Sequence, residues 1–312
     1  MKNVICFDIG GTSIKYAVIN SKGEILVKDK FPTPKKNCRE TIPSKIVEII
    51  NNKSKDFIIS SVGISTAGII DSENGIVVRA DNFQGYSGTP LREKLNLETG
   101  LDIFVENDVN AAALGEMWMG AARGHENFVC ITLGTGVGGA LVINGKLVRG
   151  VYGGAGEIGH IILNENGEAC ACGLNGCYER YASTSSLIRS YIKKSKESGI
   201  EIEYISGEEI MERDESGELL ASEVLEEFMN HLISGIVSIT HLLDTGLIVI
   251  GGGISAQGEK YFNKLNKKFS EKAMKFYVDH TSIVQAKLEN DAGLYGACYS
   301  ALNSNIKGYF SR

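Results

Sequence analysis

The sequence predicts an α/β protein with two related domains that flank a cleft. A pattern of strand, glycine loop and hairpin occurs at residues 4–27 and returns at residues 129–148. Glycine accounts for 37 of the 312 residues without a Gly-X-Y period, and such an excess indicates turns and close backbone approaches. The second half is predicted to be mostly helical, because apolar residues recur at spacings of three and four over residues 218–243.

The first domain is expected to open with an antiparallel meander. Its strands are predicted at residues 4–9, 14–19 and 24–27, and glycine-containing turns separate them. The elements expected next are a helix at 45–53, a buried strand at 57–64, a short strand at 102–105 and an alanine-rich helix at 111–118.

The second domain is expected to repeat this beginning. Strands are predicted at 129–133, 140–143 and 146–148, with a glycine turn at 134–139 and an Asn144-Gly145 hairpin turn. We interpret the echo as a structural duplication. The remaining elements are one long helix at 218–243, a buried strand at 247–250 that runs into Gly251-Gly252-Gly253, and a terminal helix at 292–302.

Composition and charge exclude several classes of protein. Hydrophobic residues make up 43% and charged residues 22% of the chain, and the net charge is −6. This balance is typical of a globular protein and offers no basic surface for a nucleic acid. The sequence has no run of eighteen apolar residues and begins without a signal-peptide pattern. We therefore expect a cytoplasmic protein with no membrane partner.

One glycine motif matches a dinucleotide-binding fingerprint. Gly134, Gly136 and Gly139 have the G-x-G-x-x-G spacing, but that fingerprint requires a helix directly after the glycines. Residues 140–145 are predicted to form a strand and a hairpin turn instead, which argues against a nicotinamide cofactor. The chain also lacks the G-x-x-x-x-G-K-[ST] pattern of a P-loop.

Two glycine-rich hairpins could together bind nucleotide phosphates. Without side chains in the way, their backbone N–H groups can approach a phosphate closely, and Thr12 and Thr135 add hydroxyl groups. Asp8 ends the first strand, where it could attract a phosphate-bound Mg²⁺ through water. The alternative is that both are ordinary tight hairpins.

A polar segment lies between the short strand and the alanine-rich helix. In Glu106-Asn107-Asp108, Asp108 or the nearby Asn110 could cap the helix by accepting its first N–H groups. Asp108 could equally project into the cleft as a general base that takes a proton from an attacking hydroxyl. The sequence leaves both roles open.

A histidine and three closely spaced cysteines form the most informative stretch. His160, Cys170, Cys172 and Cys177 provide one imidazole and three thiols, the usual donor set of a structural zinc site. The alternative is a loop of free thiols. A zinc ion would fix the loop and hold Glu157 and Glu179 on rigid flanks, where two carboxylates suit a polyhydroxylated ligand.

A second polar segment, residues 81–86, combines Asp81 and Asn82 with Phe83 and Tyr86. It could lie beside the cleft, or it could be a solvated loop.

Five motifs together carry a family resemblance. They are Asp8-Ile-Gly-Gly-Thr-Ser-Ile-Lys15, Glu106-Asn-Asp108, Leu133-Gly-Thr-Gly-Val-Gly-Gly139, Glu157-Ile-Gly-His160 and Cys170-Ala-Cys-Gly-Leu-Asn-Gly-Cys-Tyr-Glu179. The chain resembles the ROK family of bacterial sugar kinases and regulators over nearly its whole length. The resemblance implies two ribonuclease-H-like domains of the actin/hexokinase type, with ATP and a hexose meeting in the cleft. The domains expected are a small one, 1–115 plus 296–312, and a large one, 116–295, that carries the zinc loop.

The resemblance also assigns residues to the site, with Asp108 as the catalytic base. The residues implied to bind the sugar are Gly68, Asn82, Asn107, Asp108, Glu157, His160 and Glu179. Those implied to bind the nucleotide are Asp8, Gly10, Gly11, Thr12, Lys15, Gly134, Thr135, Gly136 and Gly252. The zinc ligands are His160, Cys170, Cys172 and Cys177, and one ring nitrogen of His160 would bind zinc while the other faces the sugar.

The implied activity is ATP-dependent phosphorylation of the 6-hydroxyl of glucose or a related sugar, with Mg²⁺ bound to the nucleotide. N-acetylmannosamine and β-glucosides are alternative substrates, and a non-catalytic sugar-sensing protein is an alternative of another class. Family regulators carry a helix-turn-helix domain before the first phosphate loop, whereas seven residues precede Asp8 here, so we expect a kinase. Asp81 stands where many relatives have proline. The resemblance also leads us to expect a homodimer.

Overall fold

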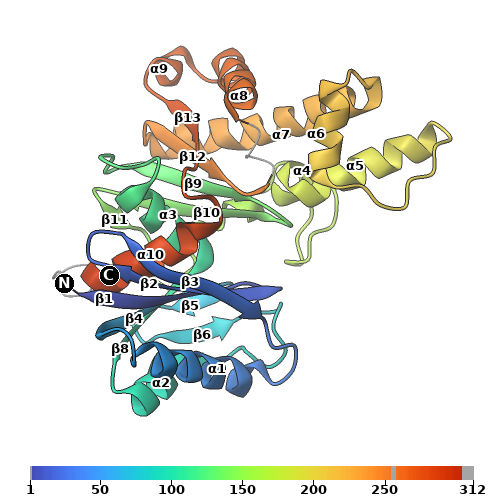
Figure 1. The fold of residues 1–312 in the computed structure, drawn as a ribbon. Helices are drawn as coiled ribbons and strands as arrows, with labels where there is room; N and C mark the ends of the chain where they lie inside the picture. The colour runs from blue at the N-terminus through green and yellow to red at the C-terminus, as the bar shows by residue number, and fades with distance from the viewer. Residues whose placement is uncertain (1, 254–257, 304–312) are drawn as a thin grey trace. The chain divides into compact units, whose positions relative to one another are not determined.

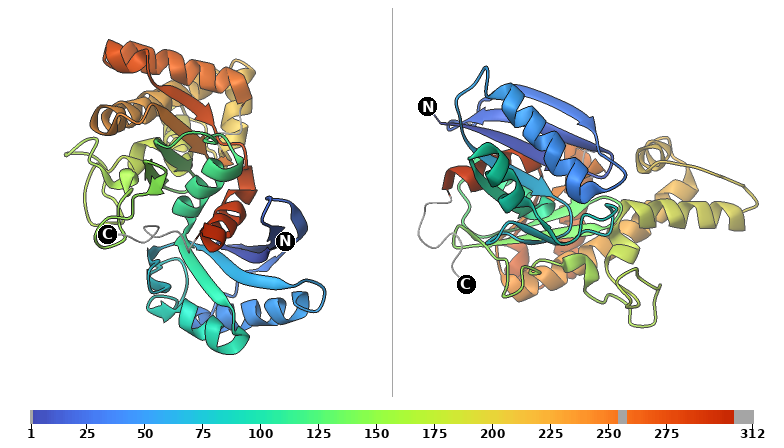
Figure 2. Two further views of the ribbon diagram at one scale, coloured as in Figure 1. Left: turned by 90° about the vertical axis from the view of Figure 1, so that its left-hand side faces the viewer. Right: turned by 90° about the horizontal axis from the view of Figure 1, so that it is seen from below.

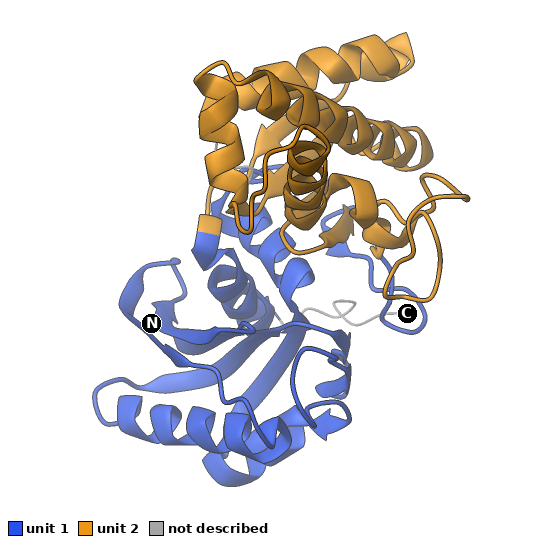
Figure 3. Cartoon of the chain, turned by 90° about the vertical axis from the view of Figure 1, so that its right-hand side faces the viewer, with its two compact units in different colours: residues 1–126, 144–155, 290–312 blue, residues 127–143, 156–289 orange. Residues whose placement is uncertain are grey.

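The computed structural model describes residues 2–253 and 258–303, and the chain divides into two compact units (Figure 3). Unit 1 comprises residues 1–126, 144–155 and 290–312, and unit 2 comprises residues 127–143 and 156–289. The domain boundaries expected after residue 115 and before residue 296 stay predictions, and residues 304–312 lie outside the described part of the chain. Most of unit 2 is thus inserted within the sequence of unit 1.

A five-stranded sheet with the order β3-β2-β1-β4-β8 forms the centre of unit 1. Its strands are β1 (Asn3–Ile9), β2 (Ser13–Asn20), β3 (Ile25–Pro32), β4 (Ile59–Thr66) and β8 (Asp102–Asn107). The first three form the predicted antiparallel meander, and β4 and β8 continue the sheet in parallel. The third strand was expected to end at Val27, but it extends to Pro32 because its pairing with β2 continues to Ser13.

Helices cover both faces of this sheet (Figures 1 and 2). They are α1 (Cys38–Lys53), α2 (Leu91–Thr99), α3 (Asp108–Met119) and α10 (Ala292–Asn303). Side chains alternate along a strand, so Ile5 and Phe7 pack with α1 and α2 while Val4 and Cys6 pack with α10. This alternation buries both faces and fixes the strand ends from which the site residues extend.

Two parts of unit 1 differ from the prediction. Helix α1 begins at Cys38 rather than at Lys45, and Pro43 lies within it, so a proline near the start did not prevent the helix from forming. A small antiparallel sheet was not predicted; its strands are β5 (Ile69–Asp71), β6 (Ile76–Arg79) and β7 (Thr89–Pro90). The loop after β6 is only partly solvated, because Phe83 and Tyr86 are buried in the core.

Helix α10 crosses α3 at backbone contact distance. A Cβ atom on Gly296 would overlap the carbonyl oxygen of Ala111, and one on Gly115 would overlap that of Ala292. Larger side chains would separate the two helices at both positions, because backbone atoms cannot yield as a flexible side chain can. The glycines therefore hold α3, the helix that follows the Glu106-Asn107-Asp108 motif, firmly in place.

A second five-stranded sheet has the order β11-β10-β9-β12-β13. Its strands are β9 (Phe128–Leu133), β10 (Val137–Ile143), β11 (Lys146–Leu147), β12 (Leu247–Gly251) and β13 (Ser282–Gln285). It repeats the first sheet, since β9 and β10 are antiparallel and β12 and β13 extend the sheet in parallel. The predicted duplication is confirmed. The predicted turn at 134–139 is too long, however, because Gly138 and Gly139 lie within β10 and pair with β9.

The helices of unit 2 pack on one large core. They are α4 (Glu179–Ala182), α5 (Thr184–Glu197), α6 (Gly207–Glu215), α7 (Leu219–Leu243), α8 (Gly258–Lys272) and α9 (Lys275–Val278), with short 3₁₀ turns at Ile158–His160 and Glu289–Asp291. The long helix expected at 218–243 is confirmed as α7, whose Leu232 and Ile236 pack with Val129 and Ile131 of β9. Among the described helices none is both long and apolar enough to cross a membrane.

Candidate active site and metal centre

The candidate base lies where β8 passes into α3. Asn107 is the N-cap: its backbone is extended, with ψ of 149°, and its Oδ1 accepts hydrogen bonds from the N–H groups of Val109 at 2.9 Å and Asn110 at 3.0 Å. Of the two roles left open for this segment, the cap thus belongs to Asn107 and not to Asp108 or Asn110. Asp108 is the first helical residue, and its carboxylate only shares the N–H group of Val109.

The amide of Asn107 also joins three of the predicted sugar-binding residues. Its Nδ2 donates to the carbonyl oxygen of Gly68 at 3.0 Å and to Oδ1 of Asp108 at 2.9 Å. Gly68 has φ of +117°, and a Cβ there would overlap the carbonyl oxygen of Arg79, so this position requires glycine. Asn82 lies in an exposed turn that follows the same strand, β6.

The environment of Asp108 raises the pKa of its carboxyl. Burial is the largest cause and the negative charge of Asp8 adds to it, whereas hydrogen bonds from Val109 and Asn107 lower the pKa. Desolvation thus outweighs the stabilisation that a carboxylate gains at a helix N-terminus. A carboxyl group with a raised pKa at a strand end is a candidate for proton transfer.

A buried carboxylate lies one residue before this junction. Glu106 accepts hydrogen bonds from Ser72 at 2.9 Å, the backbone N–H of Asn107 at 3.1 Å and the side chain of Asn110 at 3.2 Å. Its other oxygen forms a salt bridge with Arg149 at 2.5 Å. No role was predicted for Glu106 or Arg149 from the sequence. The sequence did contain a signal: Glu106 directly follows the apolar residues 103–105 of a predicted strand. A carboxylate that is buried in such a strand requires a partner.

The first glycine loop follows β1 and contains Gly10, Gly11 and Thr12. Thr33 braces it, since its hydroxyl donates to the carbonyl oxygen of Gly10 at 2.5 Å. Nothing lies within 4 Å of a Cβ built on Gly11, so the tip of the loop is open to an incoming group.

Asp8 sits at the base of this loop. Its Oδ1 accepts from the hydroxyl of Ser65 at 2.8 Å, and its Oδ2 pairs with Lys15 at 3.3 Å. Lys15 also donates to the carbonyl oxygen of Asn290 at 2.8 Å. The carboxylate thus has a fixed orientation, beside a loop that offers backbone N–H groups.

The second glycine loop contains Gly134, Thr135 and Gly136 and follows β9. The loop is closed by a hydrogen bond from the N–H of Gly134 to the carbonyl oxygen of Gly136 at 3.0 Å. The carbonyl oxygen of Gly134 accepts from Thr184, the first residue of α5, at 2.9 Å. A Cβ on Gly136 would overlap Oε2 of Glu179, so a predicted sugar ligand lies directly against this loop.

Gly252 follows β12 in unit 2. It has φ of +99°, and a Cβ there would overlap the carbonyl oxygen of Leu133. Glycine is thus required at the position that the resemblance assigns to the adenosine side.

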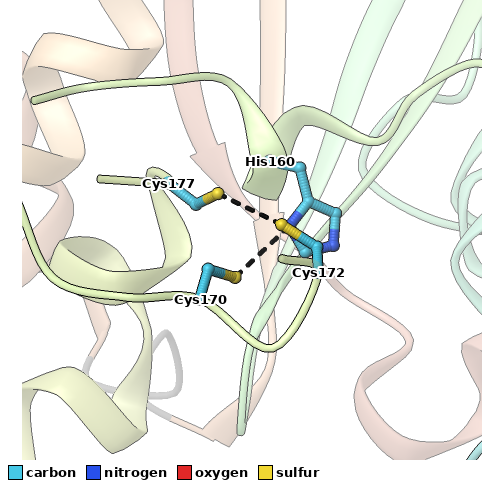
Figure 4. Close-up of side chains that lie close together, drawn as sticks. All are labelled: His160, Cys170, Cys172 and Cys177. Atoms are coloured by element: carbon cyan, nitrogen blue, oxygen red, sulfur yellow. Dashed lines mark hydrogen bonds between the residues drawn. The ribbon is translucent and has the colours of Figure 1, made fainter. Parts of the chain in front are cut away.

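The four predicted metal ligands form one cluster. One ligand atom from each of His160, Cys170, Cys172 and Cys177 lies within 4.8 Å of the others (Figure 4). Cys172 Sγ is 3.5 Å from Cys177 Sγ, and Cys170 Sγ is 3.8 Å from Nδ1 of His160. Zn–S bonds of about 2.3 Å place neighbouring donors of a tetrahedron about 3.5–3.8 Å apart. The donor set and its spacing therefore fit a zinc ion.

The cysteine environments differ within the cluster. Burial raises the pKa of Cys170 to about 12, whereas a hydrogen bond from the backbone of Leu174 lowers the pKa of Cys172. Coordinated thiols are deprotonated by the metal itself. The pKa of Cys172 is thus shifted in the opposite direction from those of Cys170 and Cys177.

The two predicted carboxylates flank His160. Glu179 Oε1 is 3.8 Å from Nδ1, and Glu157 Oε2 is 3.9 Å from Nε2. Glu179 also accepts a hydrogen bond from the thiol of Cys170 at 3.0 Å. The ring nitrogens of His160 therefore face in different directions: Nδ1 toward the cysteines and Nε2 toward Glu157.

Comparison with known proteins gives a consistent result. The sequence matches the ROK family over residues 4–304. It is 36% identical to the glucokinase of Halalkalibacterium halodurans over 93% of this chain and 92% of that protein. It is 34% identical to the glucokinase of Thermotoga maritima over 98% of each.

A solved structure agrees with these relatives. The crystal structure of a ROK family glucokinase from Streptomyces griseus in complex with glucose and AMPPNP has a TM-score of 0.81 and is 33% identical, covering 96% of this chain and 99% of that one. Together with the duplicated sheets, these matches show that the chain belongs to the ROK family and has its actin/hexokinase-type fold.

Proposed function

We propose that this protein is an ATP-dependent hexose kinase that phosphorylates the 6-hydroxyl of glucose or a closely related sugar. Family membership and the glucokinases among its relatives support a sugar kinase, and the glucose and AMPPNP bound in the Streptomyces griseus structure support the two substrates. The observation that carries the proposal is the geometry of Asp108, a carboxyl with a raised pKa that Asn107 holds at the start of α3.

Asp108 is proposed to receive the proton of the sugar hydroxyl. Its hydrogen bonds from Val109 and Asn107 both end on Oδ1, so Oδ2 is the oxygen for the substrate. Desolvation makes the carboxylate a stronger base than an exposed aspartate. Asn107 orients this carboxylate. The side chain of Asn107 is itself fixed, because its Nδ2 donates to the carbonyl oxygen of Gly68 and its Oδ1 accepts from the helix N–H groups.

The proposed sugar ligands of unit 2 are Glu157, His160 and Glu179. The carboxylates of Glu157 and Glu179 can accept hydrogen bonds from sugar hydroxyls, and the ring N–H of His160 that is not on the zinc side can donate one to a hydroxyl oxygen. A zinc ion bound by His160, Cys170, Cys172 and Cys177 would supply rigidity rather than reactivity, since four protein ligands leave a tetrahedral zinc no open position. Gly68, Asn82 and Asn107 are the proposed sugar contacts from unit 1.

The nucleotide is proposed to use both glycine loops. Gly10, Gly11 and Thr12 and their counterparts Gly134, Thr135 and Gly136 offer N–H and hydroxyl donors to phosphates, with Lys15 and Gly252 as further contacts. Asp8, fixed by Ser65 and Lys15, fits a water-mediated contact to Mg²⁺, which prefers few carboxylates. Mg²⁺ would neutralise charge on the transferring phosphoryl group.

The test is a coupled assay of ADP release with ATP and Mg²⁺ against a panel of hexoses, hexosamines and β-glucosides. We expect sugar-dependent turnover with the highest kcat/KM for glucose, and a kcat lower by about 10²-fold or more for Asp108→Asn. If N-acetylmannosamine or a β-glucoside were the best substrate, the proposed kinase activity would stand and the proposed substrate would change. Sugar binding without any phosphate transfer, by folded and zinc-loaded protein, would establish the sensor alternative. A homodimer and a cytoplasmic location remain predictions.

A further inference from the structure

Unit 2 contains a cavity that the proposed kinase function does not use. Its volume is about 420 Å³, within the range of small-molecule sites. It lies between α5 and α7, next to α4 and the loop that carries the cysteines. The side chains that matter for its chemistry are Arg180, Arg189, Lys193, Glu168, Phe228 and His231.

Two arginines of the cavity share one carboxylate. Arg180 and Arg189 both pair with the same oxygen of Glu168, at 3.0 and 2.8 Å, so one carboxylate serves two guanidinium groups. Lys194 is neutralised by Glu223 and Glu227.

Lys193 is exposed on α5, one turn from Arg189 on one side and one turn from Glu197 on the other. The feature that stands out is the pair of arginines, which have one carboxylate, Glu168, between them.

A buried donor of this arginine pair lacks an acceptor. Nε of Arg180 is buried and has no hydrogen-bond partner among the described residues, although the rest of the side chain is partly exposed. A buried N–H without a partner costs free energy, and native structures usually satisfy it with a protein group, water or a bound ion. That atom has almost no accessible surface, so an anion in the cavity would contact the partly exposed guanidinium groups of Arg180 and Arg189 instead.

The cavity also has apolar and aromatic lining. Leu187, Val224 and Phe228 contribute to it, and the rings of Tyr181 and His231 lie with their centroids 5.1 Å apart. Such a wall suits the non-ionic body of a ligand rather than a bare inorganic ion. The cavity thus combines two features of a small-molecule site: an apolar wall and a few convergent charged donors.

We propose that this cavity is a second binding site, distinct from the candidate active site, for a small organic anion whose phosphate or carboxylate group contacts Arg180, Arg189 and Lys193. Its position links it to the metal centre. Glu168 lies two residues before Cys170, its N–H donates to the hydroxyl of Tyr181 at 2.9 Å, and Arg180 directly follows Glu179. An anion that competes with Glu168 for the arginines shifts the cysteine loop and Glu179, and so changes the affinity for sugar.

Isothermal titration calorimetry of the zinc-loaded, full-length protein tests the proposal without ATP or turnover, so its outcome does not depend on the proposed kinase activity. The probes are inorganic phosphate, glucose 6-phosphate and citrate. Because phosphate also suits the glycine loops, the cavity is identified by the variant Arg189→Gln/Lys193→Gln. The matched control is Lys196→Gln, which removes an exposed charge from α5 outside the cavity.

We expect at least one probe to bind the double variant at least tenfold more weakly than the wild type and Lys196→Gln, with circular dichroism unchanged. A loss limited to the two phosphate probes would define a phosphate site, and a loss that includes citrate a general anion site. Equal affinities in all three proteins, or no binding of any probe, would overturn the proposal. The proposal would also be overturned if the double variant differed from the wild type in the molar mass measured by sedimentation while its affinity for every probe was unchanged, because the cavity would then belong to a self-association surface.

Discussion

The carboxylate of Glu106 and the guanidinium of Arg149 form a salt bridge inside unit 1. Oε2 of Glu106 lies 2.5 Å from Nη2 of Arg149, and only 3% of the Glu106 side chain is exposed. The same carboxylate accepts the backbone N–H of Asn107 at 3.1 Å. The residue that caps α3 and orients Asp108 therefore rests on a buried ion pair. The position of the candidate base depends on two residues that the substrate need not contact.

Glu106→Gln should be costly because it leaves Arg149 largely buried without its counter-charge. Removing one partner of a buried ion pair lowers the free energy of unfolding by roughly 3–5 kcal/mol. The double variant Glu106→Gln/Arg149→Met should lose less than the sum of the two single losses. Urea unfolding of the four proteins measures this coupling, and strictly additive losses would show that the pair is not energetically linked.

Asp108→Asn should separate catalysis from stability. Loss of the base should lower kcat by about 10²–10⁴-fold, whereas the amide can keep the hydrogen bond from Val109. Because burial disfavours the charged carboxylate, the variant should be at least as stable as the wild type at pH 7. Steady-state kinetics and thermal unfolding on the same preparation check both halves. Near wild-type kcat would remove Asp108 from its proposed role.

The raised pKa of Asp108 also determines in which direction the stability of the protein changes with pH. The folded state holds this proton to higher pH than the unfolded state, where the pKa is about 3.9. The carboxyl thus contributes stability that is full below that value and is lost as the pH rises through the folded pKa. The melting temperature of Asp108→Asn should gain on the wild type as the pH rises above about 4. A constant difference across the range would contradict the shift.

Catalysis should follow the same ionisation in the opposite sense. The base must be deprotonated, so kcat/KM should fall on the acid side at a pH above the usual aspartate range. Glucose binding measured without ATP over the same pH range is the control, because it shows whether the fall belongs to binding or to proton transfer.

Cys172→Ser should remove one ligand of the metal centre. We expect the zinc content to fall from about one ion per chain toward zero, since a structural site requires all four ligands, with a lower melting temperature and weaker glucose binding. Cys38→Ala is the control, because Cys38 is buried in the core of unit 1 and is not part of the cluster. Full zinc occupancy in Cys172→Ser would refute the assignment of this ligand.

Gly136→Ala should weaken glucose binding without nucleotide, because the added Cβ overlaps Oε2 of Glu179 and displaces that carboxylate. Gly134→Ala is the matched control in the same loop, where nothing lies within 4 Å of the new Cβ. Calorimetric titration with glucose compares the two. Equal affinities would mean that Glu179 does not bind the sugar or that it relaxes without loss.

Much of the fold could be predicted because its signals are local. The alternation of side chains in β1 and β2, the apolar spacing in α7 and the glycine loops each depend on a few consecutive residues. The repetition of the meander at 129–148 then predicted the second sheet. The cluster of His160 with three cysteines was also predictable, because its donor set is chemically specific.

Features that depend on distant residues were missed. Arg149 reaches Glu106 across 43 positions of sequence, and no local pattern indicates that pairing. The sequence offered Asp108 or Asn110 as one alternative for the cap on α3, because residues that favour caps are adjacent there, and only the backbone angles select Asn107. Helix α1 extends past Pro43 since the buried Ile42 and Ile46 anchor it to the sheet.

The glycine contact between α3 and α10 constrains the order in which the chain can fold during synthesis. Helix α10 is made after residues 127–289, which contribute nearly all of unit 2. Domains tend to fold as units while the ribosome is still at work, so unit 2 can complete its core first. Unit 1 must wait for Gly296 to reach Ala111, so a nascent chain halted before α10 would have a folded unit 2, with its cysteine cluster, and an α3 that still lacks its packing partner.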